Sequence, residues 1–132
     1  MSNVTIQACD WADVQHIPAM YDTESALFMR RKTPETWFRA IMQGKTVGCA
    51  CIFPLSKTKA RLSNLYVIPE YRGHGIGMRL VIAREMWARQ NGFTVIETRT
   101  KQNLHLKHGY RLIKQFKIGE KLLEKSLKET AA

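Results

Sequence analysis

The chain has 132 residues, and its 21 Lys and Arg against 11 Asp and Glu give a formal net charge of +10. This length supports one sizeable hydrophobic core, so residues 1–132 are expected to form a single domain, and the composition excludes disordered and low-complexity classes. No run approaches the ~20 apolar residues of a membrane span and the N-terminus does not resemble a signal peptide, so we expect a cytoplasmic protein without membrane contacts.

The N-terminal quarter is predicted to hold one strand and two helices. Alternating apolar and polar residues indicate a short strand over residues 4–8. Asp10 can cap a helix that extends to Met20 and is interrupted near Pro18. A second helix is expected over residues 23–31, where it ends in a basic cluster.

The middle of the chain changes to the apolar period of strands and then to a long helix. Residues 37–42 and 46–53 form a predicted hairpin around a turn that contains Gly44. Another strand is expected over residues 60–68. The longest helix is expected over residues 75–91, with these apolar side chains at helical spacing: Ile76, Leu80, Ala83, Met86 and Trp87.

The last third alternates short elements. A strand is predicted over residues 94–99, about two helical turns over 102–108, and a strand over 110–116. The tail from 118 to 128 fits either a helix or a strand, and we favour a final strand paired with 110–116. The whole order predicts an α/β (α+β) fold on a mixed sheet, with one right-handed crossover between strands 60–68 and 94–99.

Three cysteines are expected to be structural. Cys49 and Cys51 alternate within an apolar strand, and together with Cys9 they make an odd number. A Cys-x-Cys pair in an apolar run is a poor pattern for a disulfide or a zinc site. All three are therefore predicted to be small core hydrophobes.

The most informative stretch runs from Leu65 to Gly77, where a strand passes through a glycine-rich turn into the long helix. Glycines at 73, 75 and 77 remove side chains near a helix N-terminus, so a phosphate can approach the backbone N–H groups. The spacing excludes two familiar phosphate motifs. Met78 stands where the dinucleotide fingerprint needs its last glycine, and the Gly-Lys-Ser/Thr ending of a Walker motif is absent.

This stretch resembles the pyrophosphate loop of the GNAT superfamily of acyl-CoA-dependent N-acetyltransferases. That family's signature is Arg/Gln-x-x-Gly-x-Gly/Ala, preceded by Leu-x-Val-x-Pro, and the order of elements agrees along nearly the whole chain. The matching residues are Leu65, Val67, Pro69, Arg72, Gly75 and Gly77. The resemblance implies a mostly antiparallel sheet of six to seven strands, flanked by about four helices, with a splayed central strand pair and a bulge near residues 65–67.

The resemblance also implies acetyl-CoA as the cosubstrate. Its pantetheine arm would lie between the splayed strands, and the backbone N–H of Val67 or its neighbour would face the thioester carbonyl. Asn103 would contact the pantetheine arm. The residues expected to bind the cosubstrate are Leu65, Tyr66, Val67, Arg72, Gly73, His74, Gly75, Ile76, Gly77 and Asn103.

The sequence departs from the family where a general base and a general acid are usual. The strand before the glycine turn offers no Glu or His, so Glu97 on the neighbouring strand is the nearest candidate base. The alternative is that Glu97 pairs with Arg99 or another cation. Counting back from Gly109 places His105 where the family often has a Tyr that protonates the departing thiolate. No metal site is expected.

The implied function is an N-acyltransferase, most often an acetyltransferase, that acts by direct attack in a ternary complex. Residues 1–29 carry four acids and no Lys or Arg, which suits a cationic small-molecule or peptide amine, whereas the basic remainder suits the phosphates of CoA. Three alternatives stay open: a GNAT-fold binding or inhibitor protein without turnover, acetylation of aminoacyl-tRNA as in small toxins of the superfamily, and a basic surface that only aids solubility. A nucleic acid is not the favoured partner, and a homodimer is compatible with the sequence.

Overall fold

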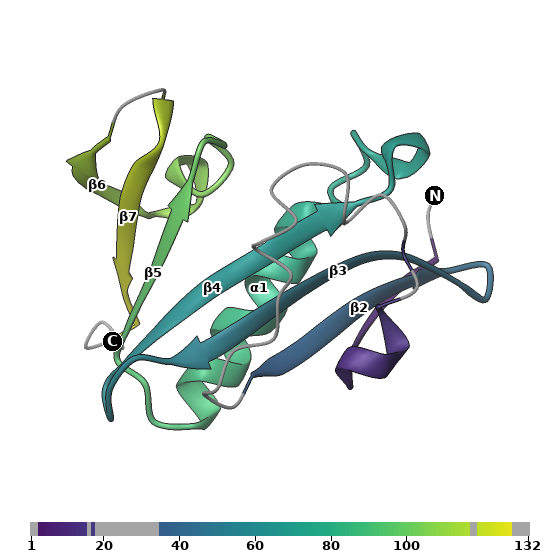
Figure 1. Ribbon diagram of the computed structural model, residues 1–132, viewed down its shortest axis with the longest axis horizontal. Helices are drawn as coiled ribbons and strands as arrows, with labels where there is room; N and C mark the ends of the chain where they lie inside the picture. The colour runs from purple at the N-terminus through teal and green to yellow at the C-terminus, as the bar shows by residue number, and fades with distance from the viewer. Residues whose placement is uncertain (1–2, 16, 18–34, 117–118, 128–132) are drawn as a thin grey trace.

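The computed structural model describes residues 3–15, 17, 35–116 and 119–127 (Figure 1). Its elements in chain order are β1 (Val4–Cys9), η1 (Trp11–Asp13), β2 (Thr36–Met42), β3 (Lys45–Pro54), β4 (Lys59–Val67), η4 (Pro69–Tyr71), α1 (Ile76–Gln90), β5 (Val95–Thr100), η5 (Leu106–His108), β6 (Arg111–Gln115) and β7 (Lys121–Ser126), where η marks a 3₁₀ helix.

The strands form one seven-stranded sheet in the order β1-β2-β3-β4-β5-β7-β6. Every neighbouring pair is antiparallel except β4 and β5, which are parallel and are connected through α1. The mixed, mostly antiparallel sheet confirms the predicted fold class. The tail is a strand that pairs with β6, as predicted, but it also inserts between β5 and β6.

The central strands β4 and β5 separate along their length. Their pairing runs only from Lys59 with Val95 to Leu62 with Thr98, although β4 continues to Val67. Figure 1 shows the two strands close at one end and divergent at the other. The implied splayed pair is therefore present, and it divides the sheet into a β1–β4 part and a β5–β7 part.

A bulge lies in β4 just beyond the last residue that pairs with β5. Against β3, Ser63 is opposite Cys51 and Tyr66 is opposite Cys49, so β4 has one residue more than β3 between these pairs. Asn64 has φ +56°, a left-handed conformation that Asn tolerates better than most residues. The bulge is thus centred on Asn64 and Leu65, at the N-terminal edge of the predicted range of 65–67.

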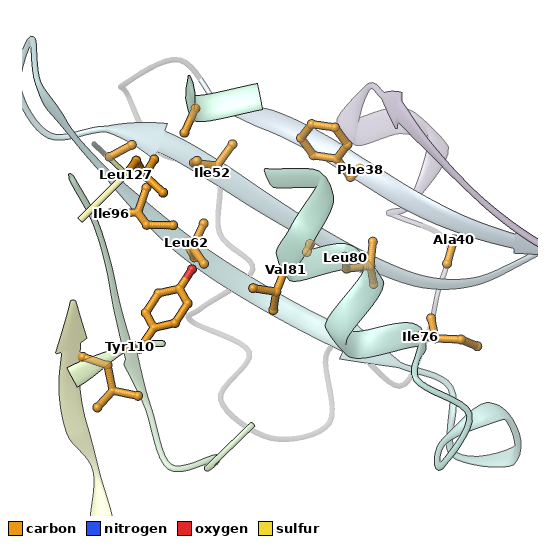
Figure 2. Close-up of a cluster of buried hydrophobic side chains, with 14 of the residues drawn as sticks. Phe38, Ala40, Ile52, Leu62, Ile76, Leu80, Val81, Ile96, Tyr110 and Leu127 are labelled. Atoms are coloured by element: carbon orange, nitrogen blue, oxygen red, sulfur yellow. The ribbon is translucent and has the colours of Figure 1, made fainter. Parts of the chain in front are cut away.

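One face of the sheet packs against α1 (Figure 2). Leu80 and Val81 of the helix and Ile52 and Leu62 of the strands are at most 2% exposed in this core. The predicted helical stripe is wrong at Met86, which is 54% exposed. Arg84 and Glu85 are buried on the side of the helix that faces the sheet, because both find polar partners there.

A second, smaller cluster covers the opposite face of the sheet. Cys49 and Cys51 alternate with residues of the first core along β3, and both are fully buried beside Trp37, Val14 and Ile17. Cys9 is partly buried against the same cluster. The prediction that the cysteines are core residues is confirmed for Cys49 and Cys51 and holds in part for Cys9.

The described residues contain one α-helix and three 3₁₀ helices, fewer than the expected four full helices. The first predicted helix begins as the 3₁₀ turn Trp11–Asp13, and the remainder of it and the helix over 23–31 lie mostly or wholly outside the described residues. Residues 102–108 form only η5, whose N–H groups bond three residues back before Gly109 ends the turn at φ +87°. No helix in the described part of the chain is long and apolar enough to cross a membrane.

Candidate functional site

The glycine turn lies between η4 and α1 and leads directly into the helix. Gly73 has φ +85°, and Gly75, the N-cap of α1, has φ +82°. These are left-handed conformations that favour glycine. A Cβ atom added at either position would meet no atom within 4 Å, so the turn is open on its outer side. Because the first N–H groups of a helix have no partners within the helix, a turn of this kind can present them to an anion.

A pocket of about 320 Å³ joins this turn to the bulged end of β4 and to the segment after β5. Its lining residues are Leu65, Tyr66, Val67, Tyr71, Arg72, Gly73, Gly75, Ile76, Gly77, Gln102 and Leu104. Gly77 lies near both sides of the pocket, since a Cβ atom there would be 4.0 Å from the side chains of both Leu65 and Leu104. The pocket therefore extends from the helix N-terminus into the opening between the splayed strands.

The structure brings most of the predicted cosubstrate-binding residues together around this one pocket. Two are not in its lining: His74 is exposed in the turn, and Asn103 is exposed between the lining residues Gln102 and Leu104. Sequence reasoning missed Gln102, Leu104 and Tyr71. Tyr71 could have been found inside the motif itself, whereas Gln102 and Leu104 required knowing how the chain after β5 folds back.

Arg72 braces the end of β4. Its Nε atom donates a hydrogen bond to the Val67 carbonyl oxygen at 2.7 Å, and its guanidinium carbon lies 5.3 Å from the ring centroid of Tyr66. Both contacts join the glycine turn to the residues that follow the bulge. Arg72 thus holds Val67 in place as well as adding positive charge beside the pocket.

Glu97 lies in an ion-pair cluster on β5. Its carboxylate accepts hydrogen bonds from the guanidinium of Arg61, the residue opposite it on β4, and one of its oxygens is 3.5 Å from the Lys59 ammonium. The side chain is 7% exposed. The sequence left open whether Glu97 is a base or an ion-pair partner of Arg99 or another cation. The structure places it beside Arg61 and Lys59, whereas Arg99 pairs with Glu120.

His105 is buried in the turn that precedes η5. The residue is 2% exposed, and its ring makes an edge contact with Tyr110 at 5.2 Å between centroids. Within the described residues neither ring nitrogen has a hydrogen-bond partner. Burial, together with the charge of Arg84, lowers the pKa of His105 to about 4, so the imidazole is neutral at pH 7. A neutral ring lacks the readily donated proton of an imidazolium.

A larger hollow of about 610 Å³ lies over β5, β6 and β7. Its charged lining residues already have partners: Glu124 pairs with Lys59 and Arg111, and Lys125 pairs with Glu85. Its lining glycine, Gly109, ends η5 rather than leading into a helix, and its described lining residues include no helix N-terminus, so we assign the function to the smaller pocket. Among the described residues no group of His, Cys, Asp and Glu could hold a metal ion.

Comparison with known proteins identifies a family and a fold. The model of the acetyltransferase (GNAT) family matches residues 3–112. No curated protein matches the chain. The solved structures include a protein assigned as an acyl-CoA N-acyltransferase from Klebsiella pneumoniae, with a TM-score of 0.78 and 22% identity over 96% of this chain and 99% of that one.

Two further solved structures carry bound ligands. A GNAT family acetyltransferase from Elizabethkingia anophelis, with acetyl-CoA bound, has a TM-score of 0.69 and 16% identity over 96% of this chain and 99% of that one. N-acetylglutamate synthase from Neisseria gonorrhoeae, complexed with coenzyme A and N-acetyl-glutamate, has a TM-score of 0.77 and 16% identity over 98% of this chain and 36% of that one. At these identities the likeness shows the fold.

Proposed function

The chain belongs to the GNAT family of acetyltransferases, and we propose that it transfers an acetyl group from acetyl-CoA to a primary amine by direct attack in a ternary complex. The observation that carries the proposal is the position of the pocket. It joins a glycine turn at a helix N-terminus to the opening between two splayed strands. An anion-binding end and a narrow channel for an extended arm are what an acyl-CoA requires.

The residues around the pocket fit the parts of acetyl-CoA. The pyrophosphate would lie at Gly73 to Gly77, where the backbone is open on its outer side, and Arg72 would add charge there. The pantetheine arm would pass Leu65, Tyr66 and Val67, and Asn103 would contact it from the segment after β5. Solved relatives of the fold that hold acetyl-CoA or CoA support this assignment.

The chemistry depends chiefly on the bulged end of β4. The amine nitrogen attacks the thioester carbonyl carbon, negative charge develops on the carbonyl oxygen, and the carbon–sulfur bond then breaks to release the CoA thiolate. We propose that the N–H of Val67 or its neighbour donates to that oxygen. A backbone donor held by a bulge and by Arg72 needs no reorganisation during the reaction.

Proton transfer concerns two further residues, Glu97 and His105. Glu97 is the candidate acceptor of the ammonium proton, but its ion pairs with Arg61 and Lys59 favour the alternative role of an ion-pair partner. His105 is the candidate donor to the thiolate, but its neutral state at pH 7 disfavours that role. A thiol has a pKa around 8.5, so the CoA thiolate is stable enough to leave without being protonated by an acid. Water or the amine's own ionisation could replace the base.

The acceptor is proposed to be a cationic small-molecule or peptide amine. The four acids of residues 1–29 suit a positively charged substrate, whereas the CoA phosphates are served by the basic remainder of the chain. N-acetylglutamate synthase, which shares this fold, was crystallised with the acetylated amino acid N-acetyl-glutamate. Amino acids therefore belong in the set of acceptors that is tested.

The decisive experiment measures acetyl-CoA binding by calorimetry and then CoA thiol release across polyamines, amino acids, aminoglycosides, peptides and charged tRNA. Saturable binding together with amine-dependent thiol release is the expected result. Absence of binding would contradict the whole proposal. Binding without thiol release for any acceptor would instead support the second candidate, a non-catalytic CoA-binding protein, which the engagement of Glu97 and the neutrality of His105 favour.

A further inference from the structure

An arginine is buried in the apolar core beneath the bulge. Arg84 is a central residue of α1, and it is 0% exposed on the face that packs against the sheet. Leu80 and Val81, both fully buried, precede it on the helix. A guanidinium is rarely fully buried without partners, so its contacts indicate why it is there.

The contacts of Arg84 converge on the bulge. Its Nη1 atom donates to the Cys51 carbonyl oxygen at 3.0 Å and is 3.4 Å from the Ser63 carbonyl oxygen. Its Nε atom donates to the Leu80 carbonyl oxygen at 3.0 Å within the helix. Cys51 and Ser63 face each other across β3 and β4 as the last regular pair before the register shifts. One guanidinium nitrogen therefore joins both strands at the base of the bulge.

The bulge departs from regular strand pairing on both sides of β4. Asn64 adopts a left-handed conformation there, and β4 has lost its β5 neighbour beyond Leu62. An extra residue in one strand also interrupts the regular ladder with β3. A charged donor gives shorter and stronger hydrogen bonds to carbonyls than a neutral one. Burial lowers the pKa of Arg84 to about 10, so the group is still protonated at neutral pH.

We propose that Arg84 is a positioning residue that clamps the β4 bulge and thereby sets the place of the backbone N–H at Val67. The inference rests on the proposed function, because it acts through the site that would bind the thioester. Arg84 itself does not line the pocket, so it acts through Ser63, Asn64 and Leu65 rather than by touching acetyl-CoA. Loss of the clamp should loosen the bulge while leaving the glycine turn intact.

The test compares three variants with the wild type. Arg84→Met keeps the length and the apolar stem but removes every donor. Arg84→Lys keeps a positive charge with a single donor group. Arg89→Met is the matched control, since Arg89 lies on the same helix with a 44% exposed side chain and, within the described residues, forms a long ion pair of 3.9 Å to Glu85. Each protein is measured for hydrogen exchange over residues 62–68, for acetyl-CoA affinity and for turnover.

In Arg84→Met, hydrogen exchange at the backbone amides of residues 62–68 should be at least tenfold faster than in the wild type, while the rest of the sheet keeps its protection. Its kcat should fall at least tenfold with acetyl-CoA affinity within about threefold, and Arg84→Lys should recover part of both changes. A merely structural role would raise exchange throughout the sheet or weaken affinity and turnover together. Unchanged exchange at 62–68 in folded Arg84→Met would overturn the proposal.

The exchange measurement separates this inference from the proposed function. If the wild type neither binds acetyl-CoA nor releases thiol, the proposed function fails, and faster exchange confined to 62–68 would still show that Arg84 holds the bulge. If Arg84→Met does not fold, Arg84→Lys decides the matter. Faster exchange at 62–68 in that variant supports the clamp, and wild-type exchange contradicts it.

Discussion

At the scale of single residues, Gly75 combines backbone conformation with access for an anion. Gly75→Asp would place a side chain and a negative charge in the open space of the turn, beside the proposed pyrophosphate. We expect acetyl-CoA affinity to fall at least tenfold, about 1.4 kcal/mol, in calorimetry. Gly44→Asp is the matched control, because Gly44 also has a positive φ and open space but lies in the β2–β3 turn. An equal loss of affinity in both variants would argue against the pyrophosphate assignment.

A substitution at Glu97 tests whether this residue is a general base or an ion-pair partner. If Glu97 is the general base, Glu97→Gln should lower kcat/KM by roughly 10²-fold and weaken the acid limb of the pH–rate profile. Because Arg61 and Lys59 already hold the carboxylate, we expect instead a kcat/KM within a few-fold and a loss of about 1–3 kcal/mol in the free energy of unfolding. Steady-state kinetics over a range of pH measure kcat/KM, and urea unfolding measures the free energy of unfolding. Glu124→Gln, which disturbs the same Lys59 from the position opposite Glu97 on β7 but leaves the Glu97 carboxylate in place, is the control.

His105 should make stability depend on pH in a definite direction. Its pKa is about 4 in the folded protein, against about 6.5 in an unfolded chain, so the unfolded state binds the proton more readily between these values. The free energy of unfolding should therefore decrease as pH falls from about 6.5 to about 4. His105→Phe should flatten this part of the urea-unfolding profile. The other acid-sensitive groups remain in both proteins, so parallel profiles would contradict the assignment.

The same histidine offers a kinetic test of the acid role. If His105 protonates the departing thiolate, His105→Ala should lose the alkaline limb of the pH–rate profile while it keeps the acid limb. Because the ring is buried and neutral, we expect both limbs to persist. An unaltered profile in this variant and in Glu97→Gln would leave substrate positioning and the backbone N–H at the bulge as the enzyme's main contribution.

At the scale of elements, the β4 bulge is the feature that connects packing to function. Asn64 is 7% exposed and left-handed there, and its Oδ1 atom lies 3.4 Å from the Cys51 sulfur. Asn64→Val puts a β-branched side chain into a conformation that it strongly disfavours. We expect a loss of about 1–2 kcal/mol in urea unfolding and a lower kcat. Asn64→Gly, which accepts this conformation, should keep kcat within a few-fold, and equal kcat in both variants would count against the bulge.

The helix α1 illustrates how element-scale packing can override a sequence pattern. Apolar spacing suggested that Met86 faces the core, but Arg84 and Glu85 occupy the inner positions. Glu85 accepts a 2.7 Å hydrogen bond from the Tyr110 hydroxyl, and the Lys125 ammonium lies 3.1 Å from its carboxylate. These contacts join α1 to β7 and to the segment before β6. Two charged side chains are thus buried because strands distant in sequence provide their partners.

At the scale of the whole molecule, the sheet has a core on each face, and the cysteines belong to the one opposite α1. Burial raises the pKa of the Cys49 thiol, which disfavours a reactive thiolate. Cys49→Ala combined with Cys51→Ala should therefore leave steady-state turnover within a few-fold, at some cost in stability. Complete loss of turnover with an unchanged circular dichroism spectrum would indicate a covalent acyl-cysteine route instead of direct transfer.

The sequence alone determined the order of the strands, the place of α1 among them and the position of the glycine turn. These depend on local signals: alternating apolar residues specify strands, and Gly73 and Gly75 specify a turn with positive φ before a helix. The family resemblance of residues 65–77 is local for the same reason. The ambiguous tail could be assigned as a strand beside β6, but its insertion between β5 and β6 could not, because strand order is decided by pairing between residues far apart in the chain.

Tertiary structure alone decided what surrounds the site. The pairing of Glu97 with Arg61 depends on the register of two parallel strands, and the neutrality of His105 depends on burial under residues from other elements. Gln102 and Leu104 line the pocket because the chain after β5 folds back toward the start of α1. The contacts of Arg84 with Cys51 and Ser63 follow the same rule. Conformational preference acts within a few residues, whereas burial and electrostatics are set by the packing of distant segments.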